Sequence, residues 1–160
     1  MIKFFKLIIL TLGISLITTQ ISYACDCTYA GKFDKFSKGQ TVIRGKIKSH
    51  GSKLNHGKTL HATMKVSVSE LIKGSYPNQS VVFMGDPGHL CLTYVDSNQY
   101  QIGSEHLFVL FNEDEKQGLA GCGEVSVSIS NGKIHGTSFS DKKLVNYSTN
   151  YDRFIKSIKD

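Results

Sequence analysis

The chain has 160 residues, which is enough for one compact domain and too few for two of ordinary size. About 40% of the residues are apolar and 20% are charged, which excludes a disordered chain, a collagen and a protein with several membrane spans. The net charge of +6 remains after 13 acidic residues are counted, so the composition does not indicate a dedicated DNA-binding protein.

The first 24 residues have the layout of a secretory signal peptide. Residues 1–6 are cationic, residues 7–17 are mostly apolar and uncharged, and small side chains stand at Ser22 and Ala24. The apolar run is short for a membrane span, so an uncleaved anchor is the less favoured alternative. We expect an exported protein, secreted or periplasmic, with no stable membrane insertion after cleavage and a single domain over residues 25–160.

Cleavage before Cys25 raises the question of lipidation. A lipoprotein signal has a branched apolar residue three positions before the cysteine and a small residue two positions before it, where this chain has Ser22 and Tyr23. We therefore favour ordinary cleavage, which leaves a free α-amino group on Cys25. Lipidation is the alternative.

The body of the chain is predicted to be mainly β. Apolar patterning predicts, in chain order, a short helix over 31–39, strands over 40–50, 59–71, 81–84, 106–111 and 125–129, and an amphipathic helix over 150–159. Gly45 is expected at a bulge, and Asn131-Gly132 at a turn. Five or so strands with a terminal helix indicate a small closed or nearly closed β-barrel of the OB type.

Alternation is clearest in the strand over 59–71. Apolar side chains at Met64, Val66 and Val68 point one way, and polar side chains point the other. Arg44 lies among apolar β-forming residues, which predicts a strand-face ion pair or packing of its aliphatic stem.

Four cysteines, Cys25, Cys27, Cys91 and Cys122, follow the signal peptide. An even number in an oxidising compartment predicts two disulfides. A Cys25–Cys27 bridge would close a strained ring, so each of these two residues is expected to reach Cys91 or Cys122, in either arrangement. Both arrangements fix the mature N-terminus to the body, which suggests a role for the terminus itself. Simple stabilisation of a secreted domain is the alternative.

Sequence motifs give no sign of catalysis. The chain has no phosphate loop, dinucleotide fingerprint, zinc-protease helix or Gly-x-Ser-x-Gly elbow, so we expect a protein that is not an enzyme and has no cofactor. Its six histidines are scattered, and we interpret them as surface or loop residues rather than metal ligands. Cys25-Asp26-Cys27 with His89-Leu90-Cys91 would suit a metal or redox site, but an oxidising compartment favours bridges. The basic strands lack interleaved aromatic residues, so nucleic acid is not an expected partner.

Several short segments resemble the tissue inhibitors of metalloproteinases, which belong to the wider netrin-like family. The mature start Cys25-Asp26-Cys27-Thr28 matches the family's Cys-x-Cys terminus, and Val42-Ile43-Arg44-Gly45-Lys46-Ile47 is similar to a family strand at the same distance. Leu71-Ile72-Lys73-Gly74 looks like the family's strand-ending Phe-Lys-Gly. Gly123 after Cys122 and the cysteine separations also match. The resemblance covers most of residues 25–130.

The resemblance implies a function for the mature terminus. It implies the bridges Cys25–Cys91 and Cys27–Cys122 and a five-stranded OB-type barrel with flanking helices. In the family, the amino nitrogen and carbonyl oxygen of the first cysteine chelate the catalytic zinc of a metalloprotease. The chelating residue here would be Cys25, and the inhibitory ridge would consist of Asp26, Cys27, Thr28, His89, Leu90 and Cys91. We expect a monomeric inhibitor with a zinc metalloprotease as partner; a netrin-like interaction module is the alternative.

Two positions depart from the family pattern. The second mature residue is Asp26, where the family usually has Thr or Ser, and a carboxylate entering an apolar pocket costs several kcal/mol if unpaired. Ser37 falls where the family has a cysteine of a third bridge.

Overall fold

A computed structural model describes residues 32–87, 92–121, 123–140 and 143–159. The predicted signal peptide lies outside these residues. In the described part of the chain no helix is long and apolar enough to cross a bilayer.

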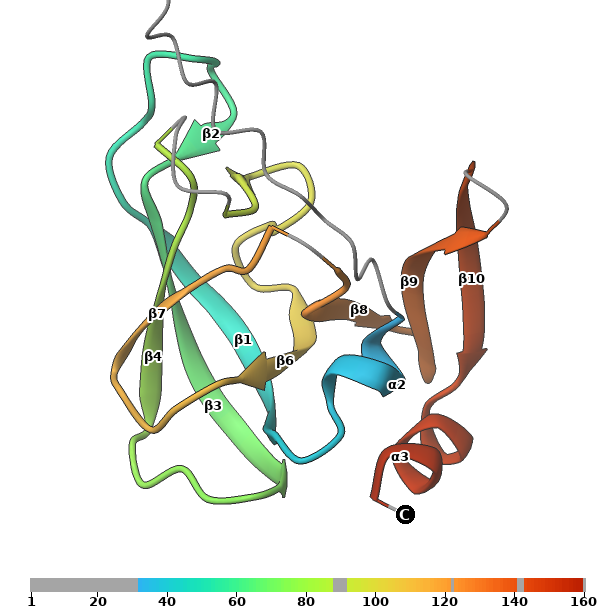
Figure 1. The fold of residues 1–160 in the computed structure, drawn as a ribbon. Helices are drawn as coiled ribbons and strands as arrows, with labels where there is room; N and C mark the ends of the chain where they lie inside the picture. The colour runs from blue at the N-terminus through green and yellow to red at the C-terminus, as the bar shows by residue number, and fades with distance from the viewer. Residues whose placement is uncertain (1–31, 88–91, 122, 141–142, 160) are drawn as a thin grey trace, which may run out of the picture.

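The fold is mainly β with a C-terminal helix (Figure 1). Its elements in chain order are α2 (Phe33–Phe36), β1 (Thr41–His50), β2 (Leu60–His61), β3 (Thr63–Lys73), β4 (Ser80–Met84), β5 (Val95–Asp96), β6 (Glu105–Leu110), β7 (Lys116–Gly118), β8 (Ser126–Ser130), β9 (Lys133–Ser140), β10 (Lys143–Asn150) and α3 (Tyr151–Lys159).

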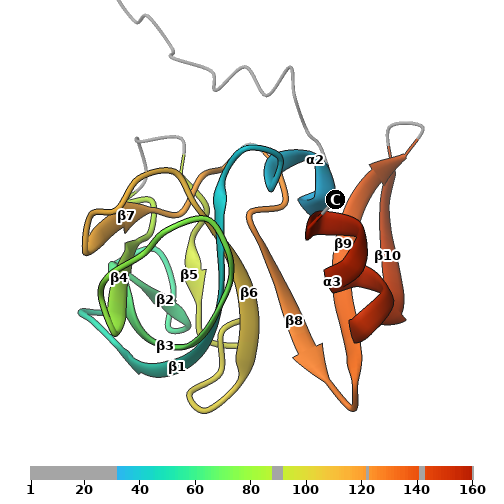
Figure 2. The ribbon, with the colours of Figure 1, turned by 90° about the horizontal axis from the view of Figure 1, so that it is seen from below.

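One large mixed sheet has the strand order β10-β9-β8-β6-β1-β3-β4-β7, and β2 pairs with β5 separately. Every pairing in the large sheet is antiparallel except β4 with β7, which is parallel. The half that contains β1, β3 and β4 is strongly curled (Figure 2). Within the described residues no backbone ladder joins β6 to β7. Just after β6, the Phe111 N–H donates instead to the side-chain Oε1 of Gln117 in β7, at 3.2 Å. Because β6 and β7 share no backbone pairing there, a closed barrel is not found.

Two hydrophobic clusters lie on opposite faces of the sheet. The first fills the inside of the curl and draws on four strands through Ile43, Ile47, Val66, Phe83 and Phe108. The second lies between the sheet and the two helices, and contains Val42, Leu107, Ile134, Phe33 and Phe154. Because successive side chains of a strand point to opposite faces, the neighbours Val42 and Ile43 belong to different clusters.

Several predicted details are confirmed. Met64 and Val66 are buried and Val68 packs partly buried against them. The β1–β3 register shifts between Arg44 and Gly45, and a Cβ on Gly45 would lie only 2.3 Å from Cγ1 of Val66. The predicted terminal helix is α3, whose Phe154 and Ile158 are buried on one face.

Arg44 makes the predicted strand-face ion pair. Its Nη2 lies 2.5 Å from Oε2 of Glu105, and its Nη1 lies 3.9 Å from Oε2 of Glu70. The guanidinium also covers the ring of Tyr151 at 5.3 Å, so the charge links the sheet to α3.

Three predictions are wrong and one is right only in part. The short helix predicted over 31–39 is present but covers only Phe33–Phe36, and Gly39 follows it with a φ of +69° before β1. The strand over 59–71 is divided into β2 and β3. The main sheet has eight strands rather than about five, since β7, β9 and β10 were not predicted. The interpretation of all six histidines as surface or loop residues fails for His61 and His106, which are buried in strands.

Candidate functional site at the N-terminal anchor

The residues that the sequence singled out lie outside the described part of the chain. These are Cys25, Asp26, Cys27, Thr28, His89, Leu90, Cys91 and Cys122. The predicted bridges, the chelating group and the inhibitory ridge therefore stay predictions. The described residues near them in sequence, which we call the anchor region, form two groups: Asp86, Leu92–Thr93 and Leu119–Ala120, which contact one another, and Gly123–Glu124, which contacts α2.

Two short extended segments of the anchor region pair with each other. Leu92 forms an isolated antiparallel bridge with Ala120. The Thr93 N–H donates to the Leu119 carbonyl at 2.6 Å, and the Thr93 hydroxyl donates to the Ala120 carbonyl at 2.9 Å. The segment that directly follows Cys91 is thus paired with the segment that precedes Cys122.

Asp86 makes hydrogen bonds to both Leu92 and Thr93. It is buried, and its Oδ2 accepts the Leu92 N–H at 3.3 Å while its own N–H donates to the Thr93 carbonyl at 3.2 Å. Leu92 packs on the neighbouring strand, since a Cβ on Gly118 would lie 3.0 Å from its Cδ2. The two ends of the 87–91 segment are therefore tied to each other and to β7.

Glu124 connects the start of the described chain to the β9–β10 hairpin. Its Oε2 accepts the Phe33 N–H at 3.1 Å and the Tyr147 hydroxyl at 2.6 Å, and its Oε1 accepts the Thr137 N–H. One carboxylate thereby joins α2, β9 and β10. Figure 1 shows α2 lying beside the β9–β10 hairpin.

A glycine allows α2 to pack closely. Gly123 has a φ of +115°, and a Cβ there would lie 1.9 Å from Cε2 of Phe36. Ser37, at the end of α2, is fully buried, and its hydroxyl donates to the Asp34 carbonyl at 3.0 Å. Ser37, which falls where the tissue inhibitors of metalloproteinases have a cysteine, thus has a hydrogen-bond partner within its own helical turn.

Burial raises the pKa of Glu124, and its three hydrogen bonds oppose that shift without cancelling it. Desolvation and the nearby Glu124 carboxylate raise the pKa of the Tyr147 hydroxyl. In the described part of the chain Glu124 forms no ion pair, so its ionised form is stabilised by hydrogen-bond donors alone.

This arrangement is suited to holding a chain segment rigidly. The described residues contain no group of three or more His, Cys, Asp or Glu side chains placed to hold a metal ion. Sequence reasoning missed Asp86, Glu124 and Tyr147. Nothing local marks Glu124, because its donors Phe33 and Thr137 are 91 and 13 residues away in the chain.

Comparison of the chain with family models, curated proteins and solved structures gives no significant match.

Proposed function

We propose that the chain is an exported inhibitor of zinc metalloproteases that acts through the α-amine and carbonyl of Cys25. One observation carries the proposal: Leu92, which follows Cys91, is paired with Ala120, two residues before Cys122, and Glu124, two residues after Cys122, accepts a hydrogen bond from the first residue of α2. This arrangement of the described neighbours supports bridges from both cysteines to a Cys-x-Cys terminus that precedes α2.

The strand order supports an OB-type domain beneath this terminus. β1 pairs with both β3 and β6, and β4 pairs in parallel with β7. This order supports, as part of the proposal, a five-stranded OB-type barrel that is open between β6 and β7. The β8–β10 strands and α3 extend it on the side of β6.

Helix α2 favours one of the two possible pairings. It packs on Gly123 and Glu124, directly after Cys122, and Cys27 precedes α2 more closely than Cys25 does. The pairing Cys27–Cys122 with Cys25–Cys91 is therefore part of the proposal. Trypsin leaves Cys25 and Cys27 in one peptide, but a protease that cleaves before Asp26 separates them, so mass spectrometry of the double digest identifies each partner.

The chemistry of inhibition follows from the terminus. A catalytic zinc keeps one coordination position open for water, and a rigid neutral amine with an adjacent carbonyl can occupy it at low entropic cost. An α-amine titrates near pH ~7.7, so inhibition should weaken as the pH falls below neutrality.

The decisive test adds one alanine before Cys25. The extension moves the amine away from the chelating geometry but leaves both bridges possible. We expect inhibition of a panel of zinc proteases to fall by orders of magnitude with an unchanged melting temperature. Equal inhibition by the extended and native proteins would exclude chelation by Cys25.

Asp26→Thr provides the matched gain-of-function variant. Removing the carboxylate removes the cost of burying a charge in an apolar pocket, so we expect tighter inhibition. The charge of Asp26 also favours the second candidate function, a netrin-like interaction module. If neither the native protein nor Asp26→Thr inhibits any protease of the panel, that module becomes the better explanation.

A further inference from the structure

Exposed lysines gather on the outer face of the curled sheet. We call Lys46, Lys48, Lys65 and Lys116 the lysine face. Lys65 lies opposite Val82, and Val82 lies opposite Lys116, so these residues form one row across β3, β4 and β7. Adjacent strands are about 4.8 Å apart, which puts the backbones of Lys65 and Lys116 roughly 10 Å apart.

Two more lysines continue the row on β1. Lys48 lies in the register shift between Ile47 and Ser49, and Ser49 is the Cα partner of Lys65. Lys46 is opposite Ser67. All four lysines of the face are exposed.

The positive charge of this face is not neutralised within the protein. In the described part of the chain none of the four lysines forms an ion pair, and Glu105, the β6 partner of Lys46, is engaged by Arg44. The ammonium groups of this face are therefore available to pair with the anionic groups of a ligand.

We propose that the lysine face binds an anionic polysaccharide. Flexible ammonium groups act as point charges and suit repeated sulfate, phosphate or carboxylate groups, whereas a single bound anion is better held by the fork of arginine. Charges on β1, β3 and β7, with the uncharged β4 between the last two, fit a linear polymer that runs across the sheet.

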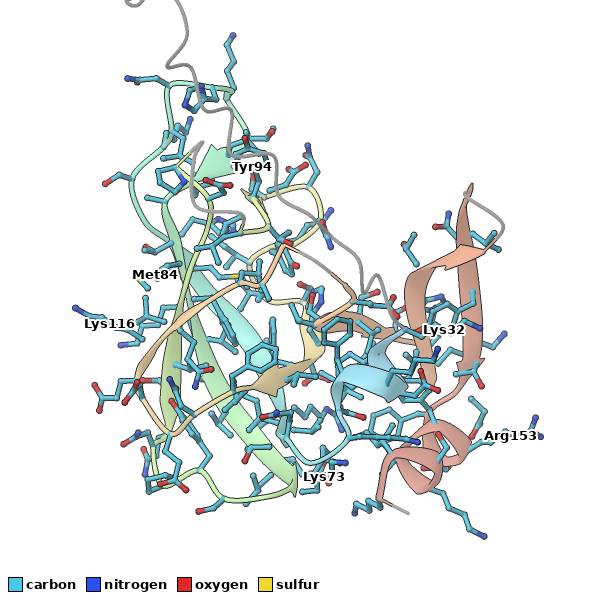
Figure 3. All side chains as sticks on the ribbon, viewed as in Figure 1. Lys32, Lys73, Met84, Tyr94, Lys116 and Arg153 are labelled. Atoms are coloured by element: carbon cyan, nitrogen blue, oxygen red, sulfur yellow. The ribbon has the colours of Figure 1, made fainter. Side chains whose placement is uncertain are left out.

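The shape and composition of the face disfavour other polyanions. Its side chains include Ser67, Val82 and the exposed Met84 but no aromatic residue on which a base could stack. The sheet curls around the first hydrophobic cluster, so the outer face is convex and offers a flat membrane little simultaneous contact (Figure 2). Figure 3 shows Met84 and Lys116 projecting to the same outer side.

The test compares two triple variants with the same loss of charge. The first is Lys46→Gln, Lys48→Gln and Lys65→Gln; it leaves Lys116, which follows the acidic residues 113–115. The control is Lys35→Gln, Lys133→Gln and Lys156→Gln, three exposed lysines on α2, β9 and α3.

Affinity for sulfated dextran is measured with the full exported protein at several salt concentrations, with neutral dextran as the blank. We expect the face variant to bind about tenfold more weakly or worse at low salt and with a shallower salt dependence, and the control to stay within about twofold of native. The single variant Lys65→Gln should show a smaller loss in the same direction, which keeps the test valid if the triple variant melts early.

Two results would overturn the proposal. Equal weakening by both triple variants would show that only net charge matters. Loss of binding to phosphatidylglycerol vesicles by the face variant, with unchanged binding to sulfated dextran, would assign the face to a membrane surface instead.

Discussion

The buried imidazole of His106 makes stability depend on pH. Its ring is only 2% exposed, stacks near Phe108 at 5.7 Å and Tyr100 at 5.3 Å, and its Nε2 lies 3.0 Å from the Ser104 hydroxyl. Burial lowers the pKa of His106 from 6.5 to about 4, so the folded protein keeps this ring neutral where the unfolded chain is protonated.

His106 therefore contributes stability that is complete above pH ~6.5 and is lost as the pH falls through about 4. We expect a loss of about 3 kcal/mol from this residue, measured by urea unfolding across that range. His106→Gln should lack this component of the slope. His56→Gln, at an exposed loop histidine, should keep it. Identical slopes for the two variants would contradict the assignment.

At this scale the sequence predicts exposed side chains better than buried polar ones. The ion pair of Arg44 was predictable, because a charged residue on a strand needs a partner. His106 was missed although it begins the most apolar strand of the chain. Every residue of β6 from His106 to Leu110 is buried, since one face meets the first cluster and the other meets the second. The continuous run of apolar residues after His106 was the signal that could have predicted burial on both faces of this strand.

At the level of elements, Glu124 fastens α2 to the β9–β10 hairpin. Glu124→Gln replaces one acceptor oxygen with an amide group that faces backbone N–H donors. We expect a loss of about 1–3 kcal/mol in the free energy of unfolding, and faster amide hydrogen exchange at Phe33 and Thr137. Tyr147→Phe, which removes a single donor, should cost less.

The pH dependence of the free energy of unfolding is a second test of the role of Glu124. Because the pKa of Glu124 is raised in the folded state, its contribution is fully present below the unfolded pKa of ~4.3 and is lost as the pH rises through the folded pKa. Its sign is opposite to that of His106. Glu124→Gln should remove this component, and an unchanged pH profile together with unchanged exchange would contradict the role of Glu124.

Predictable elements were those with strong local patterns. Strands β1, β4, β6 and β8 and helix α3 match their predicted ranges within about two residues. The Asn131-Gly132 turn was recognised, and both residues have positive φ, but its second strand was not predicted. Among the side chains of β9 and β10 whose burial the structure describes, only Ile134 is buried, so these strands carry little apolar pattern. β7 has three residues and pairs in parallel with a distant strand, which leaves no local pattern.

For the molecule as a whole, the anchor region predicts that the bridges carry much of the stability. Cys91→Ser and Cys122→Ser should each lower the free energy of unfolding by about 2–5 kcal/mol, because each bridge closes a long loop. Thermal or urea unfolding under non-reducing conditions measures the effect, and adding a reductant should abolish the difference from native. Unchanged melting of either variant would argue against the corresponding bridge.

The candidate site was predictable only in part. Cysteine spacing pointed to a fixed terminus, but the means of holding it depend on contacts between residues that are far apart in sequence. Leu92 meets Ala120, and Phe33 meets Glu124, through the strand order alone. No local composition encodes that order.

The contact between Phe33 and Glu124 also sets an order of folding. A chain that crosses a membrane N-terminus first delivers α2 long before its partners, which include Glu124, Tyr147 and Phe154. The β1–β3–β4 meander pairs neighbours in sequence and can form early, whereas the terminus must wait for contacts of high sequence separation. In the exported protein that we propose, the thiols of Cys25 and Cys27 would until then have no correct partner in place, and isomerisation would be needed to reach the predicted bridges.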